Sequence, residues 1–245
     1  MKPAVPWKTE AEMVGAFATV ARESGFSVYP ETSGWDLVLV SGDLQVGVQA
    51  KLRANVDVLA QAVDRRGLKH PGPDIRAVLV PVLVPAFVTI AVELDVWVLP
   101  ATSWTRSRAD GRWGRGDLRS VLLESAPRSP RSVPVWVPPF QPRMAGGVPS
   151  PSPVDAWKLG AIKLSLRLRR QGFVERSDFK EFGIKLNSHW TRRRAGRPPR
   201  LIASTDRGIY TMGPGTLLPD EEYPEVVEQM REAGLLDWRD AVTPG

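Results

Sequence analysis

The sequence contains no cysteine and only two histidines among its 245 residues. The absence of cysteine excludes disulfides, zinc fingers, iron–sulfur clusters and cysteine nucleophiles. The two histidines, His70 and His189, fall in different predicted domains, so a metal site built on paired histidines is not expected. A glycine-rich phosphate loop and a serine nucleophile elbow are also missing, which removes support for two common classes of hydrolase.

Long apolar segments are absent as well. There is no apolar run of eighteen residues, so a membrane-spanning helix is not expected. Residues 1–13 lack the apolar core of a secretory signal. Together with the missing cysteines, these features predict a protein without a membrane partner, located in the cytoplasm of a bacterial or phage-infected cell.

Positive charge is concentrated in one part of the chain. The net charge of the whole sequence is +6, but residues 151–215 carry +9 and residues 216–245 carry −6. A localised basic segment indicates a polyanionic partner, most simply DNA. The alternative is a basic face that is only solvated.

Residues 1–100 alternate between helical and β patterns. Apolar residues recur at helical spacing after Thr9, which forms a capping-box pattern with Glu12. Ser41, Gly42 and Asp43 have the chemistry of a hairpin turn. The predicted elements are a helix at 9–23, strands at 26–29, 35–40 and 44–50, a helix at 56–63, a strand at 75–80, a helix from 85 and a strand at 94–99. This order predicts the α/β class, with a mixed sheet flanked by helices.

Three further segments follow this first domain. Residues 101–153 are rich in Arg, Ser, Pro and Gly, which predicts a connector that packs partly against its neighbours. Residues 154–215 have the order of a winged helix-turn-helix domain. Its predicted elements are helices at 156–170, 178–182 (capped by Ser177) and 188–194, then strands at 200–203 and 209–212. Residues 216–245 predict an acidic closing helix, at 224–233, and a tail.

Polar residues that suit phosphodiester hydrolysis lie at the ends of two neighbouring predicted strands. Asp36 begins one strand, and Gln49 and Lys51 end the next. Because side chains alternate along a strand, Gln49 and Lys51 are expected on one face of the sheet, within reach of Asp36. The two oxygen donors would bind a hard divalent cation, and the lysine would stabilise developing charge.

These residues resemble the PD-(D/E)XK nuclease superfamily, in which an acid is followed by an acid or amide, one residue and a lysine. The Gln-X-Lys form is similar to the Mrr-like branch of restriction endonucleases. A looser likeness to an uncharacterised bacterial family of PD-(D/E)XK phosphodiesterases rests on Glu10, Glu31 and the run Gln61-Ala62-Val63-Asp64. The resemblance implies a restriction-endonuclease-like fold, Mg²⁺ or Mn²⁺ as cofactor, and Glu10 and Glu31 as further metal-site residues.

Gln49 is the departure from the commoner pattern, which has a carboxylate there. An amide oxygen carries no charge and binds metal less tightly, so the site is either attenuated or only binds, unless Glu10 or Glu31 restores the charge. The same pattern occurs in any hairpin with polar ends. In that alternative, Asp36 is only a carboxylate in a turn and Lys51 only a lysine at a strand end, in water. Gln61 either faces the site or, as we favour, is an ordinary polar helix position.

The helix at 188–194 is the predicted recognition helix, with Trp190 anchoring it to the domain core. Its expected DNA-binding side chains, together with those of the wing, are Asn187, His189, Arg192, Arg193, Arg194, Arg197, Arg200 and Arg207. Contacts of basic side chains with phosphates would make binding strongly dependent on salt. The alternative is a winged helix that serves protein interaction or dimerisation.

Three interpretations follow from the sequence. The first is a metal-dependent DNA endonuclease or phosphodiesterase in which Asp36, Gln49, Glu10 and Glu31 bind Mg²⁺ or Mn²⁺ and Lys51 stabilises charge. The second is a DNA-binding protein, catalytically weak or inactive, that uses the nuclease fold as a scaffold. The third is a protein–protein adaptor. A homodimer is compatible with each of them.

Overall fold

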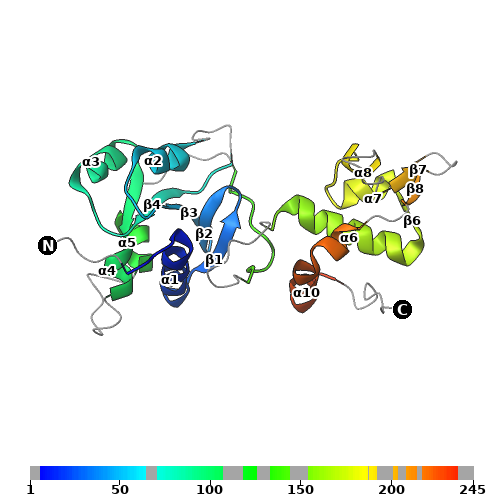
Figure 1. Ribbon diagram of the computed structural model, residues 1–245, viewed down its shortest axis with the longest axis horizontal. Helices are drawn as coiled ribbons and strands as arrows, with labels where there is room; N and C mark the ends of the chain where they lie inside the picture. Colours follow the sequence, from blue (N-terminus) through cyan, green and yellow to red (C-terminus); the bar gives the residue numbers. More distant parts are fainter. Residues whose placement is uncertain are drawn as a thin grey trace. The chain divides into compact units, whose positions relative to one another are not determined.

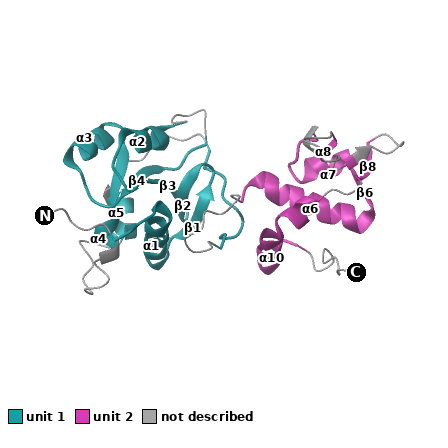
Figure 2. Ribbon diagram, viewed as in Figure 1, with its two compact units in different colours: residues 1–153 teal, residues 154–245 magenta. Residues whose placement is uncertain are grey.

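The computed structural model describes residues 6–64, 71–106, 118–125, 133–143, 154–186, 188–191, 201–203, 208–213 and 217–236. The chain divides into two compact units, unit 1 (residues 1–153) and unit 2 (residues 154–245; Figure 2). Within the ranges given, no helix has the length and apolar character needed to span a bilayer.

Unit 1 is built on a five-stranded mixed sheet with the strand order β1-β2-β3-β4-β5. The strands are β1 (Ser27–Thr32), β2 (Trp35–Ser41), β3 (Leu44–Ala50), β4 (Ile75–Val80) and β5 (Val96–Pro100). The first three form an antiparallel meander, whereas β3, β4 and β5 run parallel. Gly42, with φ of 59°, turns the chain between β2 and β3. The α/β class with a mixed sheet flanked by helices is confirmed.

Helices cover both faces of this sheet (Figure 1). One face carries α1 (Glu10–Glu23), α4 (Ala101–Arg106) and α5 (Leu118–Ser125), and the other carries α2 (Val56–Val63) and α3 (Pro85–Glu93). Alternate residues of each strand supply the two cores, because successive side chains point to opposite faces. Val48 therefore packs in the core on the α1 side, and Val78 in the core on the α2 side.

The first turn of α1 is held by the predicted capping box. The Thr9 hydroxyl accepts a hydrogen bond from the Glu12 amide at 3.1 Å, and the Glu12 carboxylate accepts from the Thr9 amide at 3.4 Å. Met13 and Phe17, on the inner face, have no exposed surface. The cap and the buried face together fix the position of Glu10, the first residue of the helix.

Parts of the segment predicted as a connector belong to the core of unit 1. Leu118 and Leu122 of α5 are fully buried on the α1 side of the sheet. Farther along, Gln45 of β3 makes two hydrogen bonds to the main chain of Val135, at 2.9 and 3.0 Å. The hydroxyl of Ser33 donates to the Trp136 carbonyl at 2.7 Å. These bonds hold residues 133–143 against the unit, because a buried amide that lost its partners would be costly.

Unit 2 contains a long helix, shorter helices and a small antiparallel sheet with the order β6-β8-β7. Its elements are α6 (Ala156–Gln171), β6 (Phe173–Glu175), α7 (Arg176–Glu181), α8 (Ser188–Thr191), β7 (Leu201–Ala203), β8 (Ile209–Met212), α9 (Pro219–Glu222) and α10 (Pro224–Glu232). Gly160 lies where α6 passes α7, and a Cβ atom there would come within 2.3 Å of the Phe182 carbonyl oxygen. A glycine is therefore required at this crossing.

The start of α7 corrects one prediction. Ser177 was expected to cap this helix, but the helix begins at Arg176 and its N-cap is Glu175. The Glu175 amide donates to the Asp178 carboxylate at 2.7 Å. The reason is that β6 runs directly into α7, so the cap is the last strand residue, and Ser177 lies in the first turn.

Trp190 anchors α8 to the core of unit 2, as predicted. Its side chain is 1% exposed, and its ring lies 5.9 Å from that of Phe179 in an edge-to-face contact. The ring of Trp157 on α6 lies 6.3 Å away. Aromatic pairs at these distances stabilise a core beyond the area that they bury, so the backbone of α8 is fixed at Trp190.

Candidate active site

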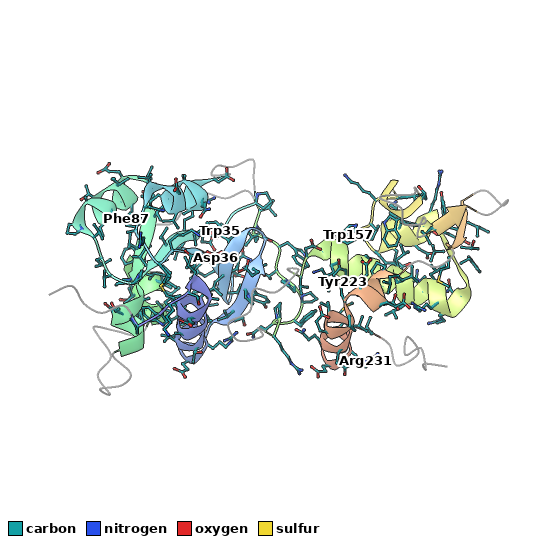
Figure 3. The ribbon with its side chains drawn as sticks, in the orientation of Figure 1. Trp35, Asp36, Phe87, Trp157, Tyr223 and Arg231 are labelled. Carbon is teal, nitrogen blue, oxygen red and sulfur yellow. The ribbon has the colours of Figure 1, made fainter. Side chains whose placement is uncertain are left out.

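Asp36 lies where the ladder between β2 and β3 ends (Figure 3). The last pair in that ladder is Leu37 with Val48. Beyond it, the Asp36 carboxylate accepts a hydrogen bond from the Ala50 amide through Oδ2, at 2.7 Å. The β3 chain meanwhile continues along β4, since the Lys51 amide donates to the Leu79 carbonyl at 3.0 Å. The two strands therefore present Asp36 and Lys51 at one end of the sheet.

Glu10 joins them from the first turn of α1. Its Oε2 atom lies 2.9 Å from Nζ of Lys51, in an ion pair and hydrogen bond. The side chains of Lys51 and Glu10 are 33% and 42% exposed, so the pair is open to solvent and stabilises the fold by at most about 1 kcal/mol. The exposure of both side chains makes them accessible to a molecule that approaches from solvent.

The charges of this cluster influence one another. Desolvation by burial raises the pKa of Asp36 above its ordinary value, and repulsion from Glu10 adds to the rise. The Ala50 amide and the Lys51 ammonium act in the opposite direction. The hydrogen bond from Lys51 to Glu10 is the main reason that the pKa of Lys51 is raised. Lys51 is thus a cation at neutral pH, suited to stabilising negative charge and not to acting as a general base.

Glu31 lies close to the same cluster, in a distorted stretch of β1. Its φ of 45° is in the left-handed region, and it is missing from the register of β1 with β2, although Pro30 and Thr32 on either side are paired. Desolvation raises the pKa of Glu31, and the charge of Asp36 raises it further. Asp36 is therefore close enough to Glu31, to Glu10 and to the Lys51 ammonium for their charges to interact.

Gln49 is placed differently from the other predicted site residues. Its side chain is 7% exposed, and its Nε2 atom donates to the Gly34 carbonyl at 2.7 Å. It lines a cavity of about 620 Å³ to which Asp36, Lys51, Glu10 and Glu31 do not contribute. The structure therefore groups Asp36, Lys51 and Glu10, with Glu31 nearby, and directs Gln49 into the neighbouring cavity.

Gln61, which was weighed as a residue facing the site, lines this cavity, whereas its residues Trp35, Arg76 and Trp136 were not predicted. We call it the Gln49 cavity, and its lining includes Trp35, Gln49, Gln61, Asp64, Arg76 and Trp136. Arg76 is 2% exposed, and its Nη1 atom donates to the Ala62 carbonyl at 2.8 Å. Residues 75–80 are otherwise apolar and predict a buried strand, and arginine is rarely buried. The position of Arg76 in that strand could therefore have indicated a special role from the sequence alone.

The chemistry of the cluster fits a hard divalent cation. Carboxylate oxygens are the protein ligands that Mg²⁺ and Mn²⁺ prefer, and Mg²⁺ is commonly held by one or two of them with waters and phosphate oxygens as the rest. In the part of the chain that the structure covers, no three or more His, Cys, Asp or Glu side chains are grouped closely enough to hold a metal. Asp36 with one of the two glutamates supplies the two carboxylates with which Mg²⁺ is commonly held.

The predicted DNA-binding residues of unit 2 are mostly not described. Asn187, Arg192, Arg193, Arg194, Arg197, Arg200 and Arg207 lie outside the described residues, and of His189 only the main chain in α8 is given. The basic side of α6 is partly neutralised: Arg167 pairs with Asp178 and Glu181, at 2.6 and 2.5 Å, and Arg169 pairs with Asp220 at 2.7 Å. These two arginines are engaged within unit 2.

Comparisons of the chain with family models, with curated proteins and with solved structures gave no match.

Proposed function

We propose that unit 1 is a metal-dependent DNA endonuclease or phosphodiesterase of the PD-(D/E)XK type, and that unit 2 holds the DNA. The observation that supports this most strongly is the convergence of Asp36 from β2, Lys51 from the position after β3 and Glu10 from α1. The order helix, three antiparallel strands, helix and parallel strand also supports a restriction-endonuclease-like fold.

Each residue of the cluster has a role in this proposal. Asp36, together with either Glu10 or Glu31, would hold Mg²⁺ or Mn²⁺. The bound cation would supply polarisation of a phosphate and a lowered pKa of bound water. The hydrogen bond to Glu10 raises the pKa of Lys51 further above neutral pH, and its ammonium would stabilise the charge that develops on the phosphate.

The Ala50 amide has a positioning role. It donates to Oδ2 of Asp36, which fixes one carboxylate oxygen, while Oδ1 accepts no hydrogen bond from residues that the structure describes. A carboxylate held in this way presents its second oxygen in one orientation. Because the Asp36 carboxylate is already fixed before the cation arrives, cation binding costs less entropy.

Unit 2 would act as a winged helix-turn-helix domain. The support is the order α6, α7, α8, β7, β8 and the burial of Trp190, which fixes the backbone of α8 in the core. His189 on that helix, with Asn187 and Arg192 to Arg194 around it, would contact DNA, and Arg197, Arg200 and Arg207 would contact phosphates. Association as a homodimer and a cytoplasmic location stay predictions.

A second candidate is DNA binding without hydrolysis. The placement of Gln49 favours it, because the amide has no charge and lines the Gln49 cavity apart from Asp36. A carboxylate at this position is the commoner ligand in the superfamily that the sequence resembles. The cluster would then lack one of its expected metal contacts.

Cleavage of supercoiled plasmid with Mg²⁺ or Mn²⁺ separates the two candidates. We expect nicked and linear products from the native protein and none from Asp36→Ala. Asp57→Ala is the matched control, since Asp57 is an exposed carboxylate on α2, away from the cluster. Binding measured in EDTA by fluorescence anisotropy should be unchanged in both variants. Binding without cleavage by the native protein supports the second candidate, and cleavage that persists in Asp36→Ala overturns the first.

A further inference from the structure

The Gln49 cavity has the features of a ligand site. Its volume of about 620 Å³ lies within the range of roughly 300–1,000 Å³ that is usual for small-molecule pockets. Two strands that carry the cluster also line it, since Trp35 directly precedes Asp36 and Gln49 lies two residues before Lys51. A ligand in this cavity would therefore contact residues that lie within two positions of the residues proposed for hydrolysis.

The walls of the cavity combine aromatic rings with amide groups. Trp35 and Trp136 supply the rings, and Gln49 and Gln61 supply carboxamides that can both donate and accept hydrogen bonds. Flat heterocycles with donors and acceptors at their edges are recognised by this combination. Among the lining residues that the structure describes, the charged ones are Arg76 and Asp64, whose charges are opposite, so this part of the wall suits a neutral group.

The walls are also held in place. The Trp35 ring lies over Gly47, where a Cβ atom would come within 2.6 Å of it, and the Arg76 guanidinium lies 5.6 Å from the ring centroid. The Ser33 hydroxyl donates to the main-chain carbonyl of Trp136 and so fixes that residue's main chain. Trp136 itself is 37% exposed, although it is a large apolar side chain. An exposed ring on a fixed main chain is available for stacking on a ligand.

We propose that the Gln49 cavity receives a single unstacked nucleobase, with a tryptophan ring on its face and the two glutamine amides at its edge. The phosphate and sugar would remain outside, because the charges of Arg76 and Asp64 in the described lining offset each other. The proposal goes beyond hydrolysis and does not depend on it: a protein without nuclease activity would still bind the base.

Photocross-linking with 5-iodouracil tests the proposal. The probes are a duplex with one unpaired 5-iodouracil, the same duplex with that base paired, and 5-iodo-deoxyuridine monophosphate, each irradiated with the full-length protein in EDTA. We expect a cross-link to Trp35 or Trp136, located by peptide mass spectrometry, and more of it from the unpaired base than from the paired one. Cross-linking of the mononucleotide alone would assign the base to a free nucleotide rather than to DNA.

Variants of the cavity residues test whether the base binds in the cavity. Trp136→Ala should weaken binding of the unpaired probe by about fivefold or more, the loss expected for one stacking ring. Gln61→Ala, an exposed position on α2, should reduce binding without affecting the core, whereas Asp57→Ala on the same helix should not. Asp36→Ala should cross-link normally, which distinguishes this proposal from the hydrolytic one. No cross-link to either tryptophan, or equal binding by Trp136→Ala and the native protein, overturns the proposal.

Discussion

Replacing Asp36 by asparagine should make the metal-free protein more stable. Burial and the nearby Glu10 raise the pKa of Asp36, so the ionised carboxylate destabilises the fold at neutral pH. An asparagine keeps an oxygen acceptor for the Ala50 amide and removes the charge. A difference of one pKa unit between folded and unfolded protein corresponds to about 1.4 kcal/mol. We therefore expect a higher free energy of unfolding and a higher melting temperature for Asp36→Asn than for the native protein in EDTA.

The gain should depend on pH in a defined direction. Below the unfolded pKa of about 3.9 the carboxyl group is protonated in both states, so Asp36→Asn and the native protein should be equally stable. As the pH rises through the raised folded-state pKa, the native protein should lose stability relative to the variant. Above that pKa the difference should stay constant.

Divalent metal should act against this difference in stability. Mn²⁺ at ten times its dissociation constant stabilises a protein that binds it by about 1.4 kcal/mol. The native protein should gain this amount and Asp36→Asn should not, while Asp57→Asn, the control on α2, should gain as much as the native protein. The measurement is differential scanning calorimetry in EDTA and in Mn²⁺. Equal stabilisation of Asp36→Asn and the native protein by Mn²⁺ would refute the assignment of Asp36 as a ligand.

Three further predictions concern the fold. Gly47→Ala should destabilise unit 1 by about 1–3 kcal/mol in urea unfolding, since its Cβ would lie 2.6 Å from the Trp35 ring; an unchanged midpoint would contradict this packing. Thr9→Ala should cost about 1 kcal/mol by removing the capping box of α1, and the same measurement checks it. Arg169→Met should cost about 2 kcal/mol in unit 2, because the Asp220 side chain, 10% exposed, loses its partner; a cost near zero would show that water replaces it.

Much of unit 1 was predictable because its signals are local. The capping box at Thr9 and the turn around Gly42 depend on residues within a few positions of each other, and both are present. The cluster of Asp36 and Lys51 was also foreseeable, since it follows from two strands that are neighbours in the chain. The error concerns Gln49 and Lys51, which were expected on one face of the sheet. Gln49 follows the alternation within β3 and lies on the α2 side, whereas Lys51 comes after the last residue of β3 and pairs with Glu10 of α1.

The parts that were missed depend on distant residues. The Gln49 cavity needs Trp136, which is held against the sheet by Ser33 about a hundred residues earlier in the chain. The proline-rich segment has no periodicity that would place it there. The helix α5 was missed for a related reason: the burial of Leu118 and Leu122 comes from α1 and the sheet, and a short helix in a polar segment gives little signal of its own.

The most direct measurement is the single-turnover rate of cleavage of labelled duplex DNA in Mn²⁺, compared between the native protein, Lys51→Ala and Lys8→Ala. Lys8 is an exposed lysine just before α1, and its replacement should leave the rate unchanged. Loss of the Lys51 ammonium should slow cleavage by about 100-fold or more, the effect of removing one group that stabilises developing charge. Cleavage by Lys51→Ala at the native rate would contradict the account of the site.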